Sequence, residues 1–207
     1  MNPVDLSLYL VTDKSDDVEK FLNTIEEAIK GGTTVVQIRE KTADTLDFYN
    51  LALKVKEITT KYNVPLIIND RVDVALAVDA DGVHVGQSDM PCDITRKLIG
   101  EDKILGVSAA TIEEAKKAQE DGADYIGSGA VFPTQTKSDA PSLTKEELKE
   151  IVESIEIPVV AIGGITLENA CELKDTGISG LSVVSAIMSS ENPKKSSQEL
   201  LKIFNSY

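Results

Sequence analysis

The chain contains few of the residues that most often carry redox, metal or nucleophilic chemistry. Its 207 residues include one histidine, two cysteines and no tryptophan, and aromatic residues make up only 4%. The single histidine, His84, leaves no cluster for zinc, and a Ser–His–Asp triad would have to use it without any GxSxG motif. Cys92 and Cys171 form no CxxC motif and cannot make a disulfide framework. We therefore interpret them as reduced thiols and expect a cytoplasmic protein.

Positive charge and long apolar runs are also scarce. The chain has 21 Lys and Arg against 35 Asp and Glu, a formal net charge of −14. This balance argues against nonspecific binding to nucleic acid or to an anionic membrane. No apolar run approaches the roughly 18 residues that span a bilayer, and the first residues carry acids where a signal peptide carries basic side chains. An anionic ligand would therefore need positive charge concentrated locally.

Short apolar runs rich in β-branched residues alternate with amphipathic helical stretches along the whole chain. We predict eight strands, at 6–13, 33–40, 65–70, 82–87, 103–109, 124–131, 157–165 and 180–187. Thr111 with Glu114, and Thr144 with Glu147, predict capping boxes at two helix starts. Glycines are expected to end helices at Gly31–Gly32, Gly122 and Gly177.

Eight strand–helix units favour one closed barrel. About 26 residues per unit is the low end for a (β/α)8 fold. Continuous apolar strands such as VVAI indicate a parallel sheet that is covered on both faces. We therefore predict an α/β protein, a single (β/α)8 TIM barrel over residues 1–207. A doubly wound open sheet is the alternative that periodicity alone does not exclude.

The end of the second strand carries an unusual polar row. Gln37, Arg39 and Lys41 share one face of this strand, while Val36 and Ile38 occupy the other. The face against the helices must be apolar, so the polar row should point into the barrel mouth, where active sites of this fold lie. Two cations there indicate an anionic ligand. The alternative is a strand end that frays into solvent.

Two carboxylates follow the third and fourth strands. Asn69–Asp70 ends the third strand, and Asp89 lies just after the fourth. A pair of carboxylates beside cations and a polyphosphate suits Mg²⁺, which is usually held by one or two carboxylates, waters and phosphate oxygens. The alternative is that Asp70 caps the third helix and Asp89 caps the fourth, ahead of Pro91.

The remaining candidates lie at the ends of later strands. They are Ser108, Thr134, Thr136, Lys137, Gly163, Gly164, Val184 and Ser185. Hydroxyls, a lysine and exposed backbone N–H groups can bind phosphate, and the loops after the last two strands are the usual phosphate site of this fold. TxTK alone is also common in surface turns, and paired glycines also occur in tight turns without ligand. His84 lies inside a strand, so we expect it to be packed and hydrogen-bonded. Arg71 could assist an anion or pair with Asp73.

Several longer motifs together resemble the thiamine-phosphate synthase (thiamine-phosphate pyrophosphorylase) family. They are LYLVTD (8–13), QIREK (37–41), IINDRVDVALAVDADGVHVGQSDMP (67–91), GVSAAT (106–111), DYIGSGAVFPTQTK (124–137), AIGGI (161–165) and VVSAI (183–187). The resemblance covers nearly the whole chain. One departure is Ala130, where the family more often has proline.

The resemblance implies a barrel enzyme of thiamine biosynthesis. It would join 4-amino-2-methyl-5-hydroxymethylpyrimidine diphosphate to 4-methyl-5-(2-phosphoethyl)thiazole, giving thiamine phosphate and pyrophosphate. Carried over by position, the pyrimidine-diphosphate site is Gln37, Arg39, Lys41, Asn69, Ser108 and Lys137, of which Arg39, Lys41, Ser108 and Lys137 would be catalytic. The Mg²⁺ ligands would be Asp70 and Asp89. The thiazole-phosphate site would be Thr134, Thr136, Gly164, Val184 and Ser185.

The family's reaction is expected to be dissociative, with loss of pyrophosphate before the thiazole nitrogen bonds. Such a reaction needs no strong base, which agrees with the shortage of histidine. Three alternatives are a related thiazole tautomerase, a silent phosphate-binding barrel and a sugar-phosphate isomerase. Retention of the NDR, SDMP and TQTK motifs argues against the tautomerase, and the presence of Asp70, Asp89 and Lys137 argues against the silent barrel. Against the isomerase, no carboxylate is a better base candidate than the proposed metal ligands. The sequence leaves open whether the chain is a homo-oligomer.

Overall fold

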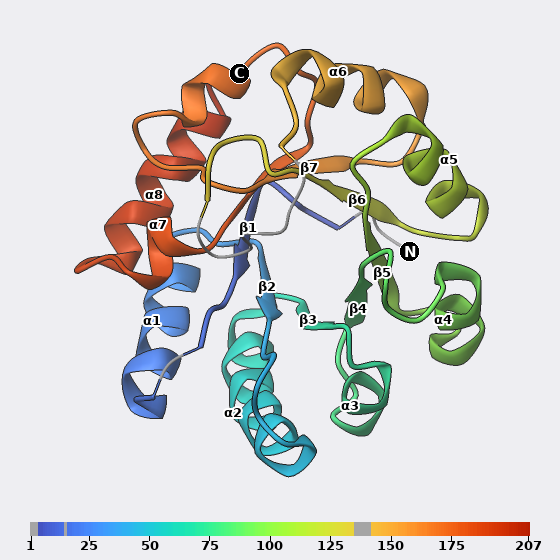
Figure 1. The fold of residues 1–207 in the computed structure, drawn as a ribbon. Helices are drawn as coiled ribbons and strands as arrows, with labels where there is room; N and C mark the ends of the chain where they lie inside the picture. The colour runs from blue at the N-terminus through green and yellow to red at the C-terminus, as the bar shows by residue number, and fades with distance from the viewer. Residues whose placement is uncertain (1–3, 15, 135–141) are drawn as a thin grey trace.

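The computed structural model describes residues 4–14, 16–134 and 142–207, and these form a closed barrel of parallel strands inside a ring of helices (Figure 1). The strands are β1 (Leu8–Val11), β2 (Val35–Ile38), β3 (Leu66–Asn69), β4 (Gly82–Val85), β5 (Ile104–Ser108), β6 (Tyr125–Ser128), β7 (Val159–Ile162) and β8 (Gly180–Val183). They pair in chain order, and β8 closes against β1. The predicted (β/α)8 barrel is confirmed, and the doubly wound sheet is excluded.

The helices follow the strands around the outside of the barrel. They are α1 (Val18–Lys30), α2 (Thr45–Tyr62), α3 (Val72–Ala77), α4 (Cys92–Ile99), α5 (Ile112–Glu120), α6 (Lys145–Ser154), the 3-10 helix η1 (Ala170–Leu173), α7 (Ser185–Met188) and α8 (Pro193–Phe204). Within the described ranges, none of them is both long and apolar enough to cross a membrane.

Two apolar cores lie on the two faces of the strands. A large core fills the space between strands and helices. A smaller core inside the barrel consists of Leu6, Tyr9, Val11, Val35, Ile67, Ile104, Tyr125 and Val160. Because side chains alternate along a strand, β1, β2, β3, β5, β6 and β7 contribute to both cores, while β4 and β8 contribute to the outer core and carry the buried polar residues His84 and Ser182. The inner core leaves the carboxyl ends of the strands open for polar side chains.

The helix starts follow the sequence signals with one shift. Thr144 and Glu147 form the complete predicted capping box at the start of α6. At the start of α5, Thr111 accepts from the Glu114 N–H as predicted, but the Glu114 carboxylate accepts from Ala110 N at 2.7 Å. The second half of that box has therefore moved one residue towards the barrel mouth.

The segment between β7 and β8 contains no α-helix, so the prediction that Gly177 ends one is wrong. Its helical part is the 3-10 helix η1, and Gly177 (φ 80°) lies four residues after it. The Asn169 side chain accepts from Thr166 N at 2.8 Å and donates to the Gly164 carbonyl at 2.9 Å. These local hydrogen bonds compete with the helical ladder.

Polar side chains connect neighbouring strands at the amino ends of the barrel. The residues before β2, β4 and β6 are Thr34, Asp81 and Asp124, and each accepts from a backbone N–H of the preceding strand, at 3.1, 2.8 and 2.7 Å. Lys56 of α2 pairs with Asp81 at 3.0 Å, and Arg96 of α4 pairs with Asp124 at 2.7 Å. Arg96 also donates to three backbone carbonyls. These hydrogen bonds and ion pairs tie neighbouring strands and helices together at this end of the barrel.

Candidate active site

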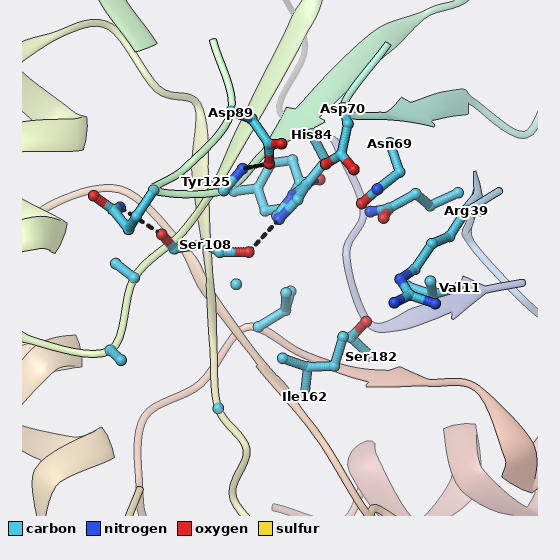
Figure 2. Close-up of a pocket in the computed structure, with 18 of the residues that line it drawn as sticks. Val11, Arg39, Asn69, Asp70, His84, Asp89, Ser108, Tyr125, Ile162 and Ser182 are labelled. Atoms are coloured by element: carbon cyan, nitrogen blue, oxygen red, sulfur yellow. Dashed lines mark hydrogen bonds between the residues drawn. The ribbon is translucent and has the colours of Figure 1, made fainter. Parts of the chain in front are cut away.

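A cavity of about 550 Å³ opens at the carboxyl ends of the strands (Figure 2). Seven predicted site residues line it, namely Gln37, Arg39, Lys41, Asn69, Asp70, Asp89 and Ser108. They come from the ends of β2, β3 and β5 and from the loop after β4. We call this cavity the larger pocket.

The polar row of β2 lines the larger pocket rather than fraying into solvent. Gln37 is buried, Arg39 is half-buried, and Lys41 lies exposed at the rim. Val36 and Ile38 on the opposite face are fully buried in the outer core. In the described part of the chain no carboxylate forms an ion pair with Arg39. A half-buried, unpaired guanidinium at a cavity wall is a ready contact for an anion.

The two carboxylates lie beside each other at the rim of this pocket, as Figure 2 shows. Asp70 forms an ion pair with Lys41, and Asp89 accepts from Gly86 N at 2.8 Å. Burial raises the pKa of Asp70, the nearby Asp89 raises it further, and Lys41 opposes both effects. A cation bound between these two half-buried carboxylates would relieve their repulsion.

Neither carboxylate caps a helix, so the alternative interpretation of this pair is excluded. The N-cap residues of α3 and α4 are Arg71 and Pro91, and neither helix start has a side-chain cap hydrogen bond. The Asp70 and Asp89 carboxylates instead contact Lys41 and the Gly86 N–H. Asp70 has φ 63°, a left-handed conformation that is uncommon outside glycine. Aspartate tolerates it better than most residues, and such backbone is concentrated at functional sites. This conformation turns the chain sharply between β3 and α3.

The donor set fits a magnesium ion better than a metal with an all-protein cage. Among the described residues, no group of three or more His, Cys, Asp or Glu side chains could surround a metal. Asp70 and Asp89 could supply two oxygen ligands, leaving the other positions to water and phosphate. Mg²⁺ is bound in this way by one or two carboxylates and substrate phosphates.

A second cavity of about 90 Å³, the smaller pocket, adjoins the larger one. Of the predicted site residues it is lined by Thr134, Gly163, Gly164, Val184 and Ser185. Both pockets are bordered by Val11, Arg39, Ile162 and Ser182. The predicted residues after β7 and β8 therefore lie together, next to the larger pocket. Thr136 and Lys137 lie outside the residues that the structure describes.

The paired glycines of the smaller pocket also have a structural reason to be glycine. Gly164 has φ 63°, and a Cβ there would lie 2.4 Å from the Pro133 carbonyl oxygen. Gly163 has φ 101°, and a Cβ there would lie 2.5 Å from the Cβ of Ala130. The turn is therefore tight as well as pocket-lining.

Some polar residues of the cavity were not predicted from the sequence. Tyr9 and Tyr125 line its floor, where Tyr125 hydrogen-bonds to Nδ1 of His84 at 2.9 Å. Burial raises the pKa of both phenols. His84 is packed and hydrogen-bonded, as expected. The available signal was that both tyrosines occupy strand positions that face the barrel interior.

Arg71 takes the second of its two predicted roles. Its guanidinium donates to the Asp73 carboxylate at 2.8 and 2.6 Å and to Thr45 Oγ1 at 2.9 Å. It does not line either pocket. Arg71 is therefore a surface contact between α2 and α3.

Similarity to known proteins covers almost the whole chain. The thiamine monophosphate synthase family model matches residues 8–187. A thiamine-phosphate synthase from Methanobrevibacter smithii is 74% identical over 204 residues, 99% of this chain and 98% of that protein. Another from Alkaliphilus oremlandii is 60% identical over 200 residues, 95% of each chain. The solved thiamine phosphate pyrophosphorylase from Pyrococcus furiosus is 42% identical, with a TM-score of 0.88 over 99% of this chain and 98% of that one. The matched range includes both pockets.

Proposed function

The chain belongs to the thiamine monophosphate synthase family and is a transferase that forms thiamine phosphate, and we propose that its two adjoining pockets hold the two substrates. The larger pocket takes 4-amino-2-methyl-5-hydroxymethylpyrimidine diphosphate, and the smaller takes 4-methyl-5-(2-phosphoethyl)thiazole. The observation that carries this assignment is Arg39, which borders both pockets and forms no ion pair within the described ranges. Because the two pockets share a wall, two substrates bound in them would lie side by side, as a reaction between them requires.

In the larger pocket, neutral polar groups serve the ring and cations serve the diphosphate. Gln37, Asn69 and Ser108 offer amide and hydroxyl contacts to the aminopyrimidine. Arg39 and Lys41, joined by Lys137, stabilise the negative charge that grows on the departing diphosphate. The role of Lys137 rests on the family resemblance alone.

Asp70 and Asp89 are the side chains that would hold Mg²⁺. What supports this is their adjacency at the rim, the repulsion between them and the absence of a helix-capping role for either. When bound, the ion supplies Lewis-acid stabilisation of the leaving group. The preference for this metal stays a prediction.

The reaction is dissociative. The bond between the pyrimidine methylene carbon and the diphosphate oxygen breaks, and its electron pair leaves with pyrophosphate. The resulting cation is stabilised by the aminopyrimidine ring. The lone pair of the thiazole nitrogen then forms the new C–N bond, so no proton has to be removed.

The smaller pocket anchors the thiazole phosphate so that its ring nitrogen reaches the cation. Thr134 and Ser185 offer hydroxyls, and the backbone at Gly163–Gly164 lies open to a phosphate. Thr136 is assigned to the same site from the resemblance. Holding the nucleophile in line replaces a bimolecular encounter by a positioned one.

The direct test is product formation from the two substrates with Mg²⁺, with and without EDTA. Metal-dependent appearance of thiamine phosphate and pyrophosphate supports both the reaction and the cation site. Product that forms equally well in EDTA would overturn the metal assignment. Absence of product with thiazole-phosphate binding intact would favour the tautomerase or the silent binder. A cytoplasmic location stays a prediction.

A further inference from the structure

A chain of four hydrogen bonds, three of them buried and one partly buried, crosses the barrel interior beneath the larger pocket. It begins at Gln37, whose Nε2 donates to Tyr9 Oη at 2.7 Å. Tyr9 Oη lies 2.6 Å from Tyr125 Oη, which in turn lies 2.9 Å from His84 Nδ1. The chain ends at Ser108, whose Oγ lies 2.9 Å from His84 Nε2. The five residues come from β2, β1, β6, β4 and β5. Its two end residues, Gln37 and Ser108, are both assigned to substrate.

Burial limits the partners of the residues in the middle of this chain. Tyr9 and Tyr125 are each 1% exposed, and His84 is 8% exposed. A phenol carries one proton, and a buried hydroxyl proton left without an acceptor is costly. Each hydroxyl proton is therefore donated to a neighbour along the chain.

The Gln37 contact sets the direction in which the protons point. Tyr9 accepts from the Gln37 amide nitrogen, so its own proton goes to Tyr125 Oη. Tyr125 in turn donates to Nδ1 of His84. A neutral imidazole with an accepting Nδ1 carries its proton on Nε2, the nitrogen that contacts Ser108.

This direction determines what Ser108 offers to the cavity. Its oxygen accepts from His84 Nε2, so its own proton is left for another acceptor. Ser108 is half-buried and lines the larger pocket. A ring nitrogen of the aminopyrimidine is an acceptor of the required kind.

Glycines on neighbouring strands leave room for the two rings of the chain. A Cβ at Gly106 would lie 2.1 Å from Cζ of Tyr125, and a Cβ at Gly127 would lie 3.2 Å from Cε1 of His84. His84, Gly106 and Tyr125 are paired at one level across β4, β5 and β6. The Tyr125 ring therefore occupies space that only glycine leaves on β5.

We propose that Tyr9, Tyr125 and His84 are positioning residues that hold Ser108 as a hydrogen-bond donor towards the aminopyrimidine. This role rests on the proposed function of the larger pocket. None of the three needs to bond substrate; they act through Ser108. The reversed chain, with every proton turned round, would instead make Ser108 an acceptor and would suit a different face of the ligand.

The direction can be read without any turnover, because His84 is the chain's one histidine. Protein labelled with nitrogen-15 histidine gives one imidazole in a long-range proton–nitrogen correlation spectrum. At neutral pH without ligand, we expect Nδ1 to be unprotonated and Nε2 protonated. An Nδ1-protonated ring or an imidazolium would overturn the proposal.

The link to substrate is tested by Tyr125→Phe, with Tyr62→Phe as the matched control. Tyr62 bonds Glu26 at 2.7 Å on the helix surface and lines neither pocket. Tyr125→Phe should raise KM for the pyrimidine diphosphate about five- to tenfold, the scale of one hydrogen bond, and leave KM for the thiazole phosphate unchanged. Tyr9→Phe, which does not touch Ser108, should act in the same direction.

The results separate this proposal from the proposed function. Equal rises in both KM values for Tyr125→Phe, or no rise in either, would contradict a positioning role. An Nε2-protonated ring in a protein that makes no thiamine phosphate would overturn the assigned substrate and leave the hydrogen-bond direction standing.

Discussion

The two ends of the barrel use the same kinds of charged residue in opposite ways. At the amino ends, Asp124 and Arg96 pair with each other and with backbone groups. At the carboxyl ends, Asp70 lies beside a second carboxylate, and Arg39 forms no ion pair within the described ranges. The amino end satisfies these charges internally, whereas the carboxyl end contains the Lys41–Asp70 ion pair but leaves Arg39 for a ligand. The barrel therefore separates residues that stabilise it from residues that act on substrates.

The largest expected effect is the loss of activity in Asp70→Asn. Removing one preorganised charge at the mouth should lower kcat about 10²- to 10³-fold. The free energy of unfolding at neutral pH should not fall, because burial and Asp89 already disfavour the ionised carboxylate. Steady-state kinetics and urea unfolding measure the two quantities.

The matched control for Asp70→Asn is Asp73→Asn. Asp73 pairs with Arg71 on the surface and lines neither pocket. Its substitution should leave kcat unchanged. Equal losses of activity in the two variants would contradict a catalytic role for Asp70. A less stable Asp70→Asn protein would contradict the claim that the carboxyl end of the barrel is not built for stability.

The next effect concerns Lys137, assigned to the diphosphate from the resemblance. Lys137→Ala should lower kcat at least ~10²-fold, because a cation on the leaving group is lost. Lys145→Ala, at the exposed start of α6, serves as the control. A Lys137→Ala enzyme with unchanged kcat would remove this residue from the site.

The amino end should respond in stability and not in catalysis. The Arg96 side chain is 10% exposed and holds Asp124 and three carbonyls. Arg96→Met should lower the free energy of unfolding by about 2–4 kcal/mol, with kcat of the folded enzyme unchanged. Lys97→Met removes an exposed pair on the same helix and should change stability by less than ~0.5 kcal/mol. If Arg96→Met and Lys97→Met lowered the free energy of unfolding by similar amounts, the amino end would not have the structural role assigned to it.

The smallest effect belongs to the helix layer, which lies at neither end. Lys61 and then Tyr62 lower the pKa of Glu26 from 4.5 to about 2. Because the folded pKa is the lower one, this contact stabilises the protein above pH 4.5 and is lost as the pH falls towards about 2. Glu26→Gln should therefore have a slightly lower Tm than wild type at pH 7, and the gap should close in acid. If the difference in Tm between wild type and Glu26→Gln grew as the pH fell, the ionised Glu26 carboxylate would not be the stabilising form.

Strand periodicity was sufficient for much of the fold and part of the site. The alternation of Gln37 and Arg39 with apolar residues predicted which face enters the mouth, because the pleat fixes it. The adjacency of Asp70 and Asp89 followed from the rule that parallel strands end at one edge. Each prediction depended only on the alternation of side chains within one strand or on the position of the next parallel strand.

Other features depend on contacts between distant strands and could not be read from local patterns. Tyr9 and Tyr125 are 116 residues apart, and only barrel closure brings their hydroxyls together. Similarly, Asn169 donates to the Gly164 carbonyl in a segment whose helical part is the 3-10 helix η1, where the sequence predicted a helix ending at Gly177. In the sequence both tyrosines resemble ordinary core residues. Their polar role appears only when the register of the five strands that carry the hydrogen-bond chain is known.

The measurement that tests the difference between the two ends most directly is ligand-linked stability. Tm is recorded with Mg²⁺ alone, pyrophosphate alone and both together, for wild type and for Asp70→Asn and Asp89→Asn. A ligand that binds the native state raises Tm by mass action. We expect a clear rise in wild type only with both present, and none in either variant. A rise with pyrophosphate alone that EDTA does not change, or an equal rise in the variants, would contradict a cation site at the barrel mouth.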